Sequence, residues 1–296
     1  MKKTRPVNSN SRENYMKGKT VLVTGATSGI GKETAAGIAG MGATVLVHAR
    51  DRSRGETAVA EIIARTGNRA VKLLVADLAS LREVKSLAKQ VRSETGTLDV
   101  VINNAGGYFS KRRITPDGFE WTFALNVLAP FVINGELLPL LARSGKGRIV
   151  NVSSEAQRMG TIVWDDPMLS KQYSGIKAYS QAKLALIMYT ITLAENIGPR
   201  HVTANVLHPG LVKTNFMSNS TGLFRFFGNL VINLTAWPVE RGAETSVYLA
   251  TSDEVLGVTG KYYHLRGEIQ RNKISDNAAD REKLWNLLEQ YTGVTY

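Results

Sequence analysis

The sequence predicts an α/β protein with a doubly wound, mostly parallel sheet of about seven strands, flanked by helices. Short apolar runs alternate with helical patterns along the chain, which is the order expected of repeated β-α units. Several runs are apolar almost throughout, as in strands that are covered on both faces. The 296 residues contain no internal repeat, low-complexity tract or linker, so we expect a single domain.

The expected strands and helices follow from these patterns. The strands are expected at residues 20–24, 43–48, 70–76, 98–103, 148–152, 202–207 and 260–264. The helices are expected at residues 29–41, 53–66, 80–95, 118–142, 176–197, 240–250 and 279–291. Asp51 or Ser53 is a plausible N-cap of the second helix, and Ser80 with Glu83 fits a capping box at the third.

Composition and charge narrow the function classes. The absence of cysteine excludes disulfides, thiolate catalysis and cysteine-based metal sites, and we expect no bound metal. A net charge of +12 could attract nucleic acid, anionic lipid or a phosphorylated ligand. Since the chain has no nucleic-acid motif, we expect no nucleic-acid partner. A phosphate-bearing cofactor and a solvated surface then account for the charge.

The N-terminal residues are expected to lie outside the folded domain. Residues 1–17 are polar and basic, which predicts a flexible tail before a domain formed by residues 18–296. The tail lacks the apolar segment of a secretory signal. No stretch of the chain reaches the roughly 18 consecutive apolar residues that span a bilayer. We therefore expect a soluble, cytoplasmic protein without a transmembrane segment.

A glycine-rich turn follows the first expected strand and predicts a phosphate site. Glycine permits positive φ and lets the backbone approach a pyrophosphate closely. The next helix directs its N–H groups and positive dipole end toward that phosphate. A ligand-free turn is the alternative, but the position within a βαβ unit favours binding. The expected contacts are Gly25, Thr27, Ser28, Gly29, Ile30 and Gly31.

The end of the second strand is expected to select the cofactor. An acidic residue there would bind the ribose hydroxyls of NAD and repel the 2′-phosphate of NADP. Ala49 stands where the acid is expected, and the guanidinium of Arg50, which follows, suits a phosphate. Asp51 could be the discriminating acid instead, or a helix cap. We predict NADP, with NAD as the alternative.

Tyr179 and Lys183 are the candidate catalytic pair. Their spacing of four places both side chains on one face of a helix. A neighbouring ammonium favours the phenolate form of tyrosine, which could then take a proton from an alcohol or return one to a carbonyl. The same spacing also occurs by chance in many helices. Ser154, at the end of the fifth strand, could donate a hydrogen bond to the substrate oxygen, with Ser153 as the adjacent alternative.

Three further segments complete the candidate site. Asn104, Ala105 and Gly106 follow the fourth strand and are expected to line the cofactor, unless they form an ordinary turn. Asn126 lies within an expected helix, where asparagine is mildly unfavourable, so it could hold a water that relays protons to Lys183. The loop after the sixth strand is either a simple turn or closes on the nicotinamide, with Thr214 binding the carboxamide. His208, just before it, is interpreted as structural rather than catalytic.

Together these segments resemble the short-chain dehydrogenase/reductase family, over residues 19 to about 265. The matching elements are TGATSGIG (24–31), Asp77-Leu78, NNAG (103–106), Asn126, Ser154, YSQAK (179–183) and PGLVKT (209–214). The resemblance implies a Rossmann fold, an NAD(P) cofactor, and reversible hydride transfer between the nicotinamide and an alcohol/carbonyl pair. It also implies a homo-oligomer, a dimer or tetramer, that pairs through the helices after strands four and five.

Specific residue roles are implied by the same resemblance. The implied catalytic tetrad is Asn126, Ser154, Tyr179 and Lys183. Asp77 would contact the adenine and Asn104 the cofactor ribose region. Tyr179 and Lys183 would also contact the cofactor. The remaining implied cofactor contacts are Leu78, Ala105, Gly106, Pro209, Gly210, Val212 and Thr214.

A closer similarity is to the retinol dehydrogenase-like branch of that family. The supporting segments are 117–131, 148–160 and the C-terminal GKYYHLRGE and REKLWNLLEQYTG. Residues 215–237 fall where the family places its substrate lid, and they are strongly apolar. We hypothesise an apolar small-molecule substrate; a lid that packs on a partner subunit, or rests peripherally on a membrane, is an alternative. A catalytically idle NADP-binding scaffold that acts through a protein partner is the alternative function.

Overall fold

The computed structural model describes residues 14–210, 212 and 237–296. Its strands are β1 Thr20–Val23, β2 Thr44–Ala49, β3 Val71–Val75, β4 Val100–Asn103, β5 Gly147–Val152, β6 Val202–Leu207, β7 Tyr262–His264 and β8 Gly267–Glu268. Its helices are α1 Gly29–Ala39, α2 Arg52–Thr66, α3 Leu81–Glu94, α4 Trp121–Phe123, α5 Ala129–Arg143, α6 Gly175–Ile197, α8 Val239–Thr251 and α9 Ala278–Thr292.

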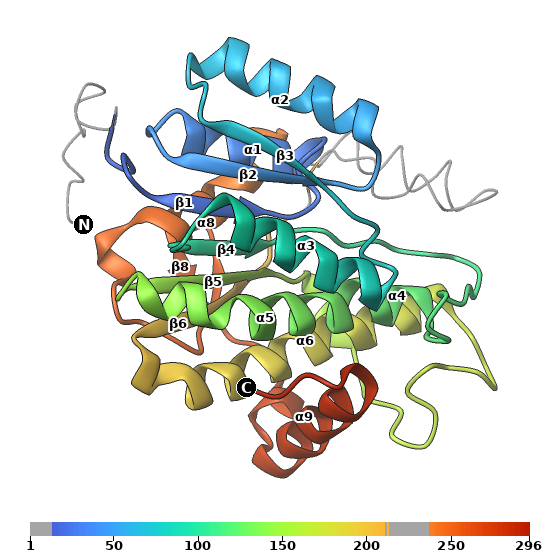
Figure 1. Cartoon of the computed structure of the whole chain (residues 1–296). Coiled ribbons are helices and arrows are strands. Elements are labelled where there is room, and N and C mark those ends of the chain that lie inside the picture. The colour runs from blue at the N-terminus through green and yellow to red at the C-terminus, as the bar shows by residue number, and fades with distance from the viewer. Residues whose placement is uncertain (1–13, 211, 213–236) are drawn as a thin grey trace.

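The strands form one sheet, in the order β3-β2-β1-β4-β5-β6-β7-β8. All neighbouring pairs are parallel except β7–β8, which is antiparallel. Helices lie on both sides of the sheet (Figure 1). The predicted doubly wound α/β fold is therefore confirmed, with β8 as a strand beyond the expected seven.

Two apolar cores sandwich the sheet. One core joins α1, α2 and α8 to one sheet face, and the other joins α3, α5, α6 and α9 to the opposite face. Central strands supply buried residues to both cores: Leu22 belongs to one and Val21 and Val23 to the other. This double burial explains why the strands are continuous apolar runs rather than alternating ones.

The strand order places a switch point between β1 and β4. From this point the chain winds outward in one direction through β2 and β3 and in the other through β5 and β6. Open parallel sheets bind ligands in the crevice at the carboxyl ends of the strands at such a point. The loops that follow β1 and β4 therefore meet at one sheet edge.

The expected helix at 118–142 is interrupted by a wider turn. Its path runs through α4, a π-helical turn at Ala124–Leu128 and α5. Among the described residues, one helix, Trp121–Arg143, has the length and hydropathy to cross a membrane, and 78% of its apolar window is buried inside the domain. The expectation from the sequence considered only uninterrupted runs of apolar residues. It did not find this stretch, because polar residues such as Asn126 interrupt the run.

Two local expectations about segment ends were wrong. The domain begins before residue 18, because Met16 is buried and its N–H donates to the Met41 carbonyl at 2.8 Å. The capping box at α3 does not form, since the Ser80 side chain makes no cap hydrogen bond and Glu83 instead accepts from the Asp77 N–H at 2.6 Å. In contrast, Asp51 is the N-cap of α2. The rest of the tail, residues 1–13, lies outside the described residues.

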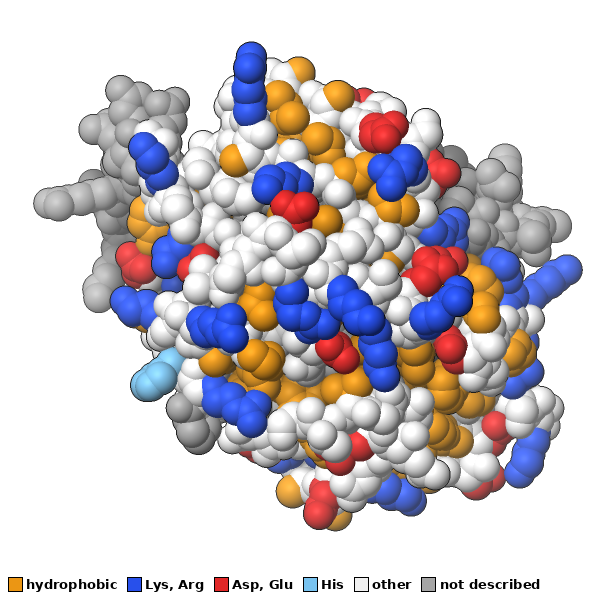
Figure 2. All heavy atoms as spheres, viewed as in Figure 1, with side chains coloured by type: hydrophobic (Ala, Val, Ile, Leu, Met, Phe, Trp, Pro, Cys, Tyr) orange, Lys and Arg blue, Asp and Glu red, His pale blue; other side chains and the backbone are white. Residues whose placement is uncertain are grey.

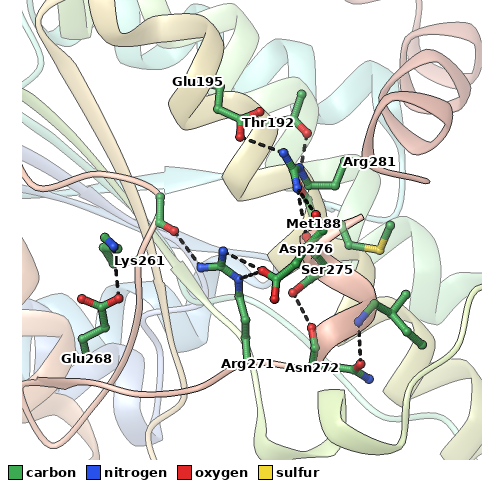
Figure 3. A network of polar contacts seen from close by, with 12 residues as sticks. Met188, Thr192, Glu195, Lys261, Glu268, Arg271, Asn272, Ser275, Asp276 and Arg281 are labelled. Atoms are coloured by element: carbon green, nitrogen blue, oxygen red, sulfur yellow. Dashed lines mark hydrogen bonds and ion pairs between the residues drawn. The ribbon is translucent and has the colours of Figure 1, made fainter. Parts of the chain in front are cut away.

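Helix α9 covers part of the surface through which the family resemblance implies pairing. The helices after β4 and β5 are α5 and α6, and α9 packs on α6. Arg281 of α9 donates to Glu195 of α6 at 2.8 Å (Figure 3). In the segment that precedes α9, Arg271 pairs with Asp276 at 2.8 Å. The Tyr296 hydroxyl also donates to the Phe131 carbonyl of α5. Pairing of two copies through this surface stays a prediction.

The positive charge is spread over the surface and partly neutralised. Figure 2 shows Lys and Arg side chains in a band across the middle of one face, around α3 and α5. Among the described residues, Lys72 of β3 pairs with Glu94 of α3 at 2.7 Å, and Arg92 of α3 pairs with Glu136 of α5 at 3.1 Å. Exposed pairs of this kind contribute little to stability and leave the charge solvated.

Candidate active site

The predicted site residues gather at the carboxyl edge of the sheet. The glycine turn follows β1, Asn104 follows β4, Ser154 follows β5 and Pro209 follows β6. Helix α6 brings Tyr179 and Lys183 to the same edge. The parallel strand order is what unites these distant segments, because all these strands end on one side.

Tyr179, Lys183 and Ser154 form the centre of the site. The Lys183 Nζ lies 5.5 Å from the centroid of the Tyr179 ring. Lys183 is 4% exposed, and its Nζ donates to the Val152 carbonyl at 2.8 Å. Burial lowers the pKa of Lys183 to about 7. Burial raises the pKa of the Tyr179 phenol, and a hydrogen bond with Ser154 opposes that rise.

The geometry distinguishes Ser154 from Ser153. The buried Ser153 Oγ donates to the Lys183 carbonyl at 2.9 Å, so its hydroxyl serves to hold α6. The Ser154 hydroxyl faces the Tyr179 phenol instead. Successive side chains of an extended segment point to opposite sides, which accounts for the division of roles. Of the two alternatives, Ser154 is therefore the one in the candidate catalytic site.

Asn126 turns a buried oxygen toward Lys183. Its Nδ2 donates to the Gly107 carbonyl at 3.0 Å and the Thr122 carbonyl at 2.8 Å. Its Oδ1 is buried and has no hydrogen-bond partner among the described residues. A Cβ placed on Gly106 would lie 2.6 Å from this Oδ1 and 3.2 Å from the Lys183 Nζ, so both atoms border the same space. An unpaired buried oxygen beside an ammonium suits a bound water.

The glycine turn fits an anionic group. Gly25 and Gly29 have φ values of +64° and +55°, which favour glycine. The N-terminus of α1 that follows has no side-chain cap and no acidic residue in its first turn. Its N–H groups and dipole are therefore available to a phosphate, as predicted for Thr27, Ser28, Ile30 and Gly31.

Asn104 and Ala105 hold this turn from the β4 side. The Asn104 Nδ2 donates to the Thr24 and Gly25 carbonyls at 2.9 and 3.2 Å. The Ala105 N–H donates to the Thr24 Oγ1 at 3.0 Å. The Asn104 amide nitrogen is thus engaged with the glycine turn, and the implied contact of this residue with the cofactor ribose region stays a prediction. Gly106 is exposed at the same edge.

The two residues that follow β2 have different roles: Asp51 caps α2, whereas Arg50 is an exposed cation. The Asp51 Oδ1 accepts from the Arg54 N–H at 2.9 Å and caps α2, which is the structural role considered for it. Arg50 is exposed, and within the described part of the chain no carboxylate pairs with it. A guanidinium in this place is free to meet a phosphate.

Asp77 and Leu78 form the loop after β3. Asp77 is partly buried, and its Oδ1 accepts from the Ala79 N–H at 3.0 Å. Leu78 is buried, at 4% exposed. The loop therefore lies at the same sheet edge as the glycine turn and presents a carboxylate with one oxygen engaged.

The loop after β6 is described only in part. Gly210 has a φ of +83°, and its Cα lies against the ring of Trp237. Val212 forms a parallel bridge with Trp237. Pro209 is partly buried beside them. Thr214 and nearly all of the expected lid, residues 215–237, lie outside the described residues.

The long segment between Ser154 and Tyr179 is held by hydrogen bonds to Phe109 and to Glu120, which is the N-cap of α4. The Tyr173 hydroxyl donates to the Phe109 carbonyl at 2.8 Å and to the buried Glu120 at 3.2 Å. The Glu120 carboxylate caps α4, accepting from the Thr122 and Phe123 N–H groups. Sequence reasoning missed this contact, since nothing local marks Glu120 as buried.

His48 is a second residue that sequence reasoning missed. Its Nδ1 accepts from the Gly25 N–H at 3.1 Å, and its Nε2 lies 3.0 Å from the Ala76 carbonyl. It is 3% exposed, and burial lowers its pKa to about 4. A histidine within the apolar run TVLVHA was the available signal, because a buried polar side chain needs partners.

The buried His48 predicts a loss of stability in mild acid. The unfolded chain takes up a proton at about pH 6.5, whereas the folded chain does so only near pH 4. Between these values the unfolded state binds more protons, so the free energy of unfolding falls as pH falls. We expect His48 to account for a loss of about 2 kcal/mol between pH 7 and pH 5.

Urea unfolding of the wild type and His48→Asn at both pH values measures this contribution. The variant lacks the titrating imidazole, so its loss of stability in acid should be smaller by that amount. Equal losses of unfolding free energy in the two proteins would show that His48 is not the source of the acid sensitivity.

Comparison with known proteins identifies the same architecture. Residues 19–222 match the short chain dehydrogenase family. The chain is 38% identical to human retinol dehydrogenase 14, covering 94% of this chain and 88% of the relative. It is 34% identical to mouse retinol dehydrogenase 12 (94% and 88% covered) and 34% identical to human polyprenol dehydrogenase (93% and 86% covered).

Solved structures show the same arrangement. An uncharacterized protein from Mycobacterium paratuberculosis matches with a TM-score of 0.77 and 29% identity, covering 95% of this chain and 96% of that one. The complex of Pseudomonas aeruginosa RhlG with NADP in its active site matches with a TM-score of 0.67 and 26% identity, covering 84% and 96%. The resemblance first drawn from scattered motifs therefore extends over the whole fold.

Proposed function

This chain belongs to the short chain dehydrogenase family, and we propose that it is an NADP(H)-dependent oxidoreductase that interconverts an apolar alcohol and its carbonyl. One observation carries the proposal: four side chains lie together beside the glycine turn and the uncapped N-terminus of α1. They are those of Tyr179, Lys183, Ser154 and Asn126. The family relationship to retinol dehydrogenases supports the reaction class.

The chain's own residues supply the proton chemistry. The bound cofactor supplies or accepts the hydride. Ser154 positions the substrate oxygen beside the Tyr179 hydroxyl, which gives or takes the proton. The Lys183 ammonium favours the phenolate form of Tyr179, against the opposing effect of burial. The unpaired Asn126 Oδ1 suits a water that passes protons between Lys183 and solvent.

The apolar substrate rests on three observations. Human retinol dehydrogenase 14 and human polyprenol dehydrogenase, two relatives of this chain, are named for retinol and polyprenol, which are both apolar alcohols. Tyr108 lies edge-on to Tyr179, at 6.2 Å between ring centroids, and Tyr108 and Phe109 are buried beside the site. The expected lid is apolar in sequence.

The preference for NADP(H) rests on the ends of β2 and α2. Asp51 is committed to capping α2, and Arg50 is exposed and free of carboxylates among the described residues. We expect Arg50→Ala to weaken NADPH binding about 10- to 100-fold, as for loss of a charge-assisted hydrogen bond. NADH binding should change little, because NADH lacks the 2′-phosphate.

Fluorescence titration with both cofactors measures this effect. Arg52→Ala is the matched control, since Arg52 already pairs with Glu56 at 3.8 Å. A larger effect in Arg52→Ala than in Arg50→Ala would move the phosphate contact to the neighbouring arginine. Equal weakening of NADPH and NADH would refute a role in discriminating the two.

Turnover tests the activity itself. Purified protein with NADPH is mixed with a panel of apolar aldehydes, including retinal, and with matched short polar aldehydes. Oxidation of NADPH by the apolar members, and not by the polar ones, is the expected result. Tight NADPH binding with no turnover across the panel would favour the alternative, a catalytically idle scaffold that acts through a partner.

A further inference from the structure

We infer that His48 and His208 are positioning residues that hold the two glycine turns on either side of the cofactor cleft. The inference rests on the proposed NADP(H)-dependent function. The two histidines lie far apart in the sequence, yet each accepts a hydrogen bond from the N–H of a glycine in a turn at the carboxyl edge of the sheet. Neither histidine belongs to the tetrad.

His48 holds the turn after β1. Its Nδ1 accepts from the Gly25 N–H at 3.1 Å, so the ring proton must sit on Nε2. That Nε2 lies 3.0 Å from the Ala76 carbonyl and donates to it. The imidazole thus links the glycine turn to the loop that carries Asp77, and both loops lie on the β2–β1 side of the switch point.

His208 has the same arrangement at the turn after β6. Its Nδ1 accepts from the Gly210 N–H at 3.2 Å, which again places the proton on Nε2. Nε2 lies 3.2 Å from the Glu155 carboxylate. Since Glu155 directly follows Ser154, the ring joins the turn after β6 to the serine loop. The ring also stacks on His264, with centroids 4.0 Å apart and planes 7° apart.

Both turns need support from outside. Gly25 and Gly210 have φ values of +64° and +83° and have no side chain with which to fix the turn. Only a neutral imidazole can accept at Nδ1. Burial lowers the pKa of each histidine to about 4, which keeps both rings neutral at physiological pH. His208 and Glu155 therefore form a neutral-to-charged hydrogen bond rather than an ion pair.

The two positions predict separate effects on the ligand. The β1 turn is proposed to hold the phosphates, so His48 should affect any ligand that contains the ADP moiety. The family resemblance implies cofactor contacts at Pro209 and Gly210, and of the two readings of this loop we adopt the one in which it closes on the nicotinamide. His208 should then affect only ligands that carry the ring. A role limited to packing would produce no such separation.

Paired substitutions at each position test the inference. An asparagine Oδ1 can take the place of Nδ1 and accept from glycine, whereas a glutamine amide reaches only the place of Nε2. The ligands are NADPH and 2′-phospho-ADP-ribose, which lacks the nicotinamide. We expect His48→Gln to weaken both ligands about three- to tenfold, and His48→Asn to bind both like wild type.

At the second position the expected pattern differs. His208→Gln should weaken NADPH about three- to tenfold and lower kcat, while binding of 2′-phospho-ADP-ribose stays unchanged. His208→Asn should restore NADPH binding. His201→Gln is the control, because His201 is exposed and distant from both turns. Thermal unfolding of each variant checks that the Asn and Gln forms are folded to the same extent.

Several outcomes would overturn the inference. They are equal binding by the Asn and Gln variants at either position, or weakening of both ligands by His208→Gln. If the wild type binds neither ligand, the proposed function itself fails; if it binds both and no variant differs, only this inference fails. Imidazole ¹⁵N spectra of the wild type test the geometry without substitution: His48 and His208 should carry the proton on Nε2, and protonated Nδ1 at either would refute the proposal.

Discussion

Replacing Tyr179 by phenylalanine should lower kcat about 1000-fold, within the range typical of general acid–base groups. The substitution removes one hydroxyl and keeps the ring that packs edge-on against Tyr108 at 6.2 Å. The Tyr179 phenol is the one that shares a hydrogen bond with the Ser154 hydroxyl, so its loss removes the proton donor from the place proposed for the substrate oxygen. Binding of NADPH should change far less than kcat, because Tyr179 is only one of the implied cofactor contacts and the turns that are proposed to hold the cofactor are untouched.

Single-turnover kinetics with saturating NADPH measures the chemical step directly. Tyr291→Phe is the matched control, since Tyr291 is partly buried against Phe119 and lies outside the site. If Tyr179→Phe keeps more than about a tenth of wild-type turnover, another group moves the proton and the assignment is wrong.

The second large effect is expected for Lys183→Met, at about a 100-fold loss of kcat. Burial alone raises the pKa of the Tyr179 phenol, and the Lys183 ammonium, 5.5 Å from its ring, is the cation placed to counter that rise. Methionine fills a similar space without the charge or the hydrogen bond to Val152. At pH values where Lys183 is charged in the wild type, the tyrosine of the variant should then hold its proton more tightly.

The pH dependence of alcohol oxidation separates this role from simple packing. Burial lowers the pKa of Lys183 to about 7, so loss of its ammonium should slow oxidation most at and below that pH, where the charge is present to favour the phenolate. Lys177→Met, an exposed lysine on the same helix, should leave both rate and profile unchanged. A Lys183→Met protein with reduced activity but the wild-type pH profile would indicate a packing role only.

The strands and helices were accessible from the sequence because burial leaves a local pattern. Parallel strands covered on both faces must be apolar throughout, and the seven expected strands were found within a few residues of their predicted ends. Strand β8 left no such pattern, since Gly267 and Glu268 are both exposed. The π-helical turn at Asn126 was also invisible, because a single wide turn of five residues is too short for its different period to show in the sequence pattern.

The sequence by itself determined the fold class, the glycine turn and the tyrosine–lysine pair. The fold class follows from the alternation of strand and helix patterns along the chain, and the glycine turn and the tyrosine–lysine pair each depend on neighbouring residues whose spacing places them together. It left open the choices between Ser153 and Ser154 and between the roles of Arg50 and Asp51.

Only the tertiary structure decided how the polar atoms of the site are paired. Gly25 meets His48 across 23 residues, and Ala105 meets Thr24 across 81, because β2 and β4 both lie beside β1. A hydrogen bond requires its donor and acceptor to be placed to within a few tenths of an ångström. Strand order and helix packing set this placement, and the local sequence does not. For this reason the sequence named the tetrad, whereas the histidines that hold its glycine turns came from the structure.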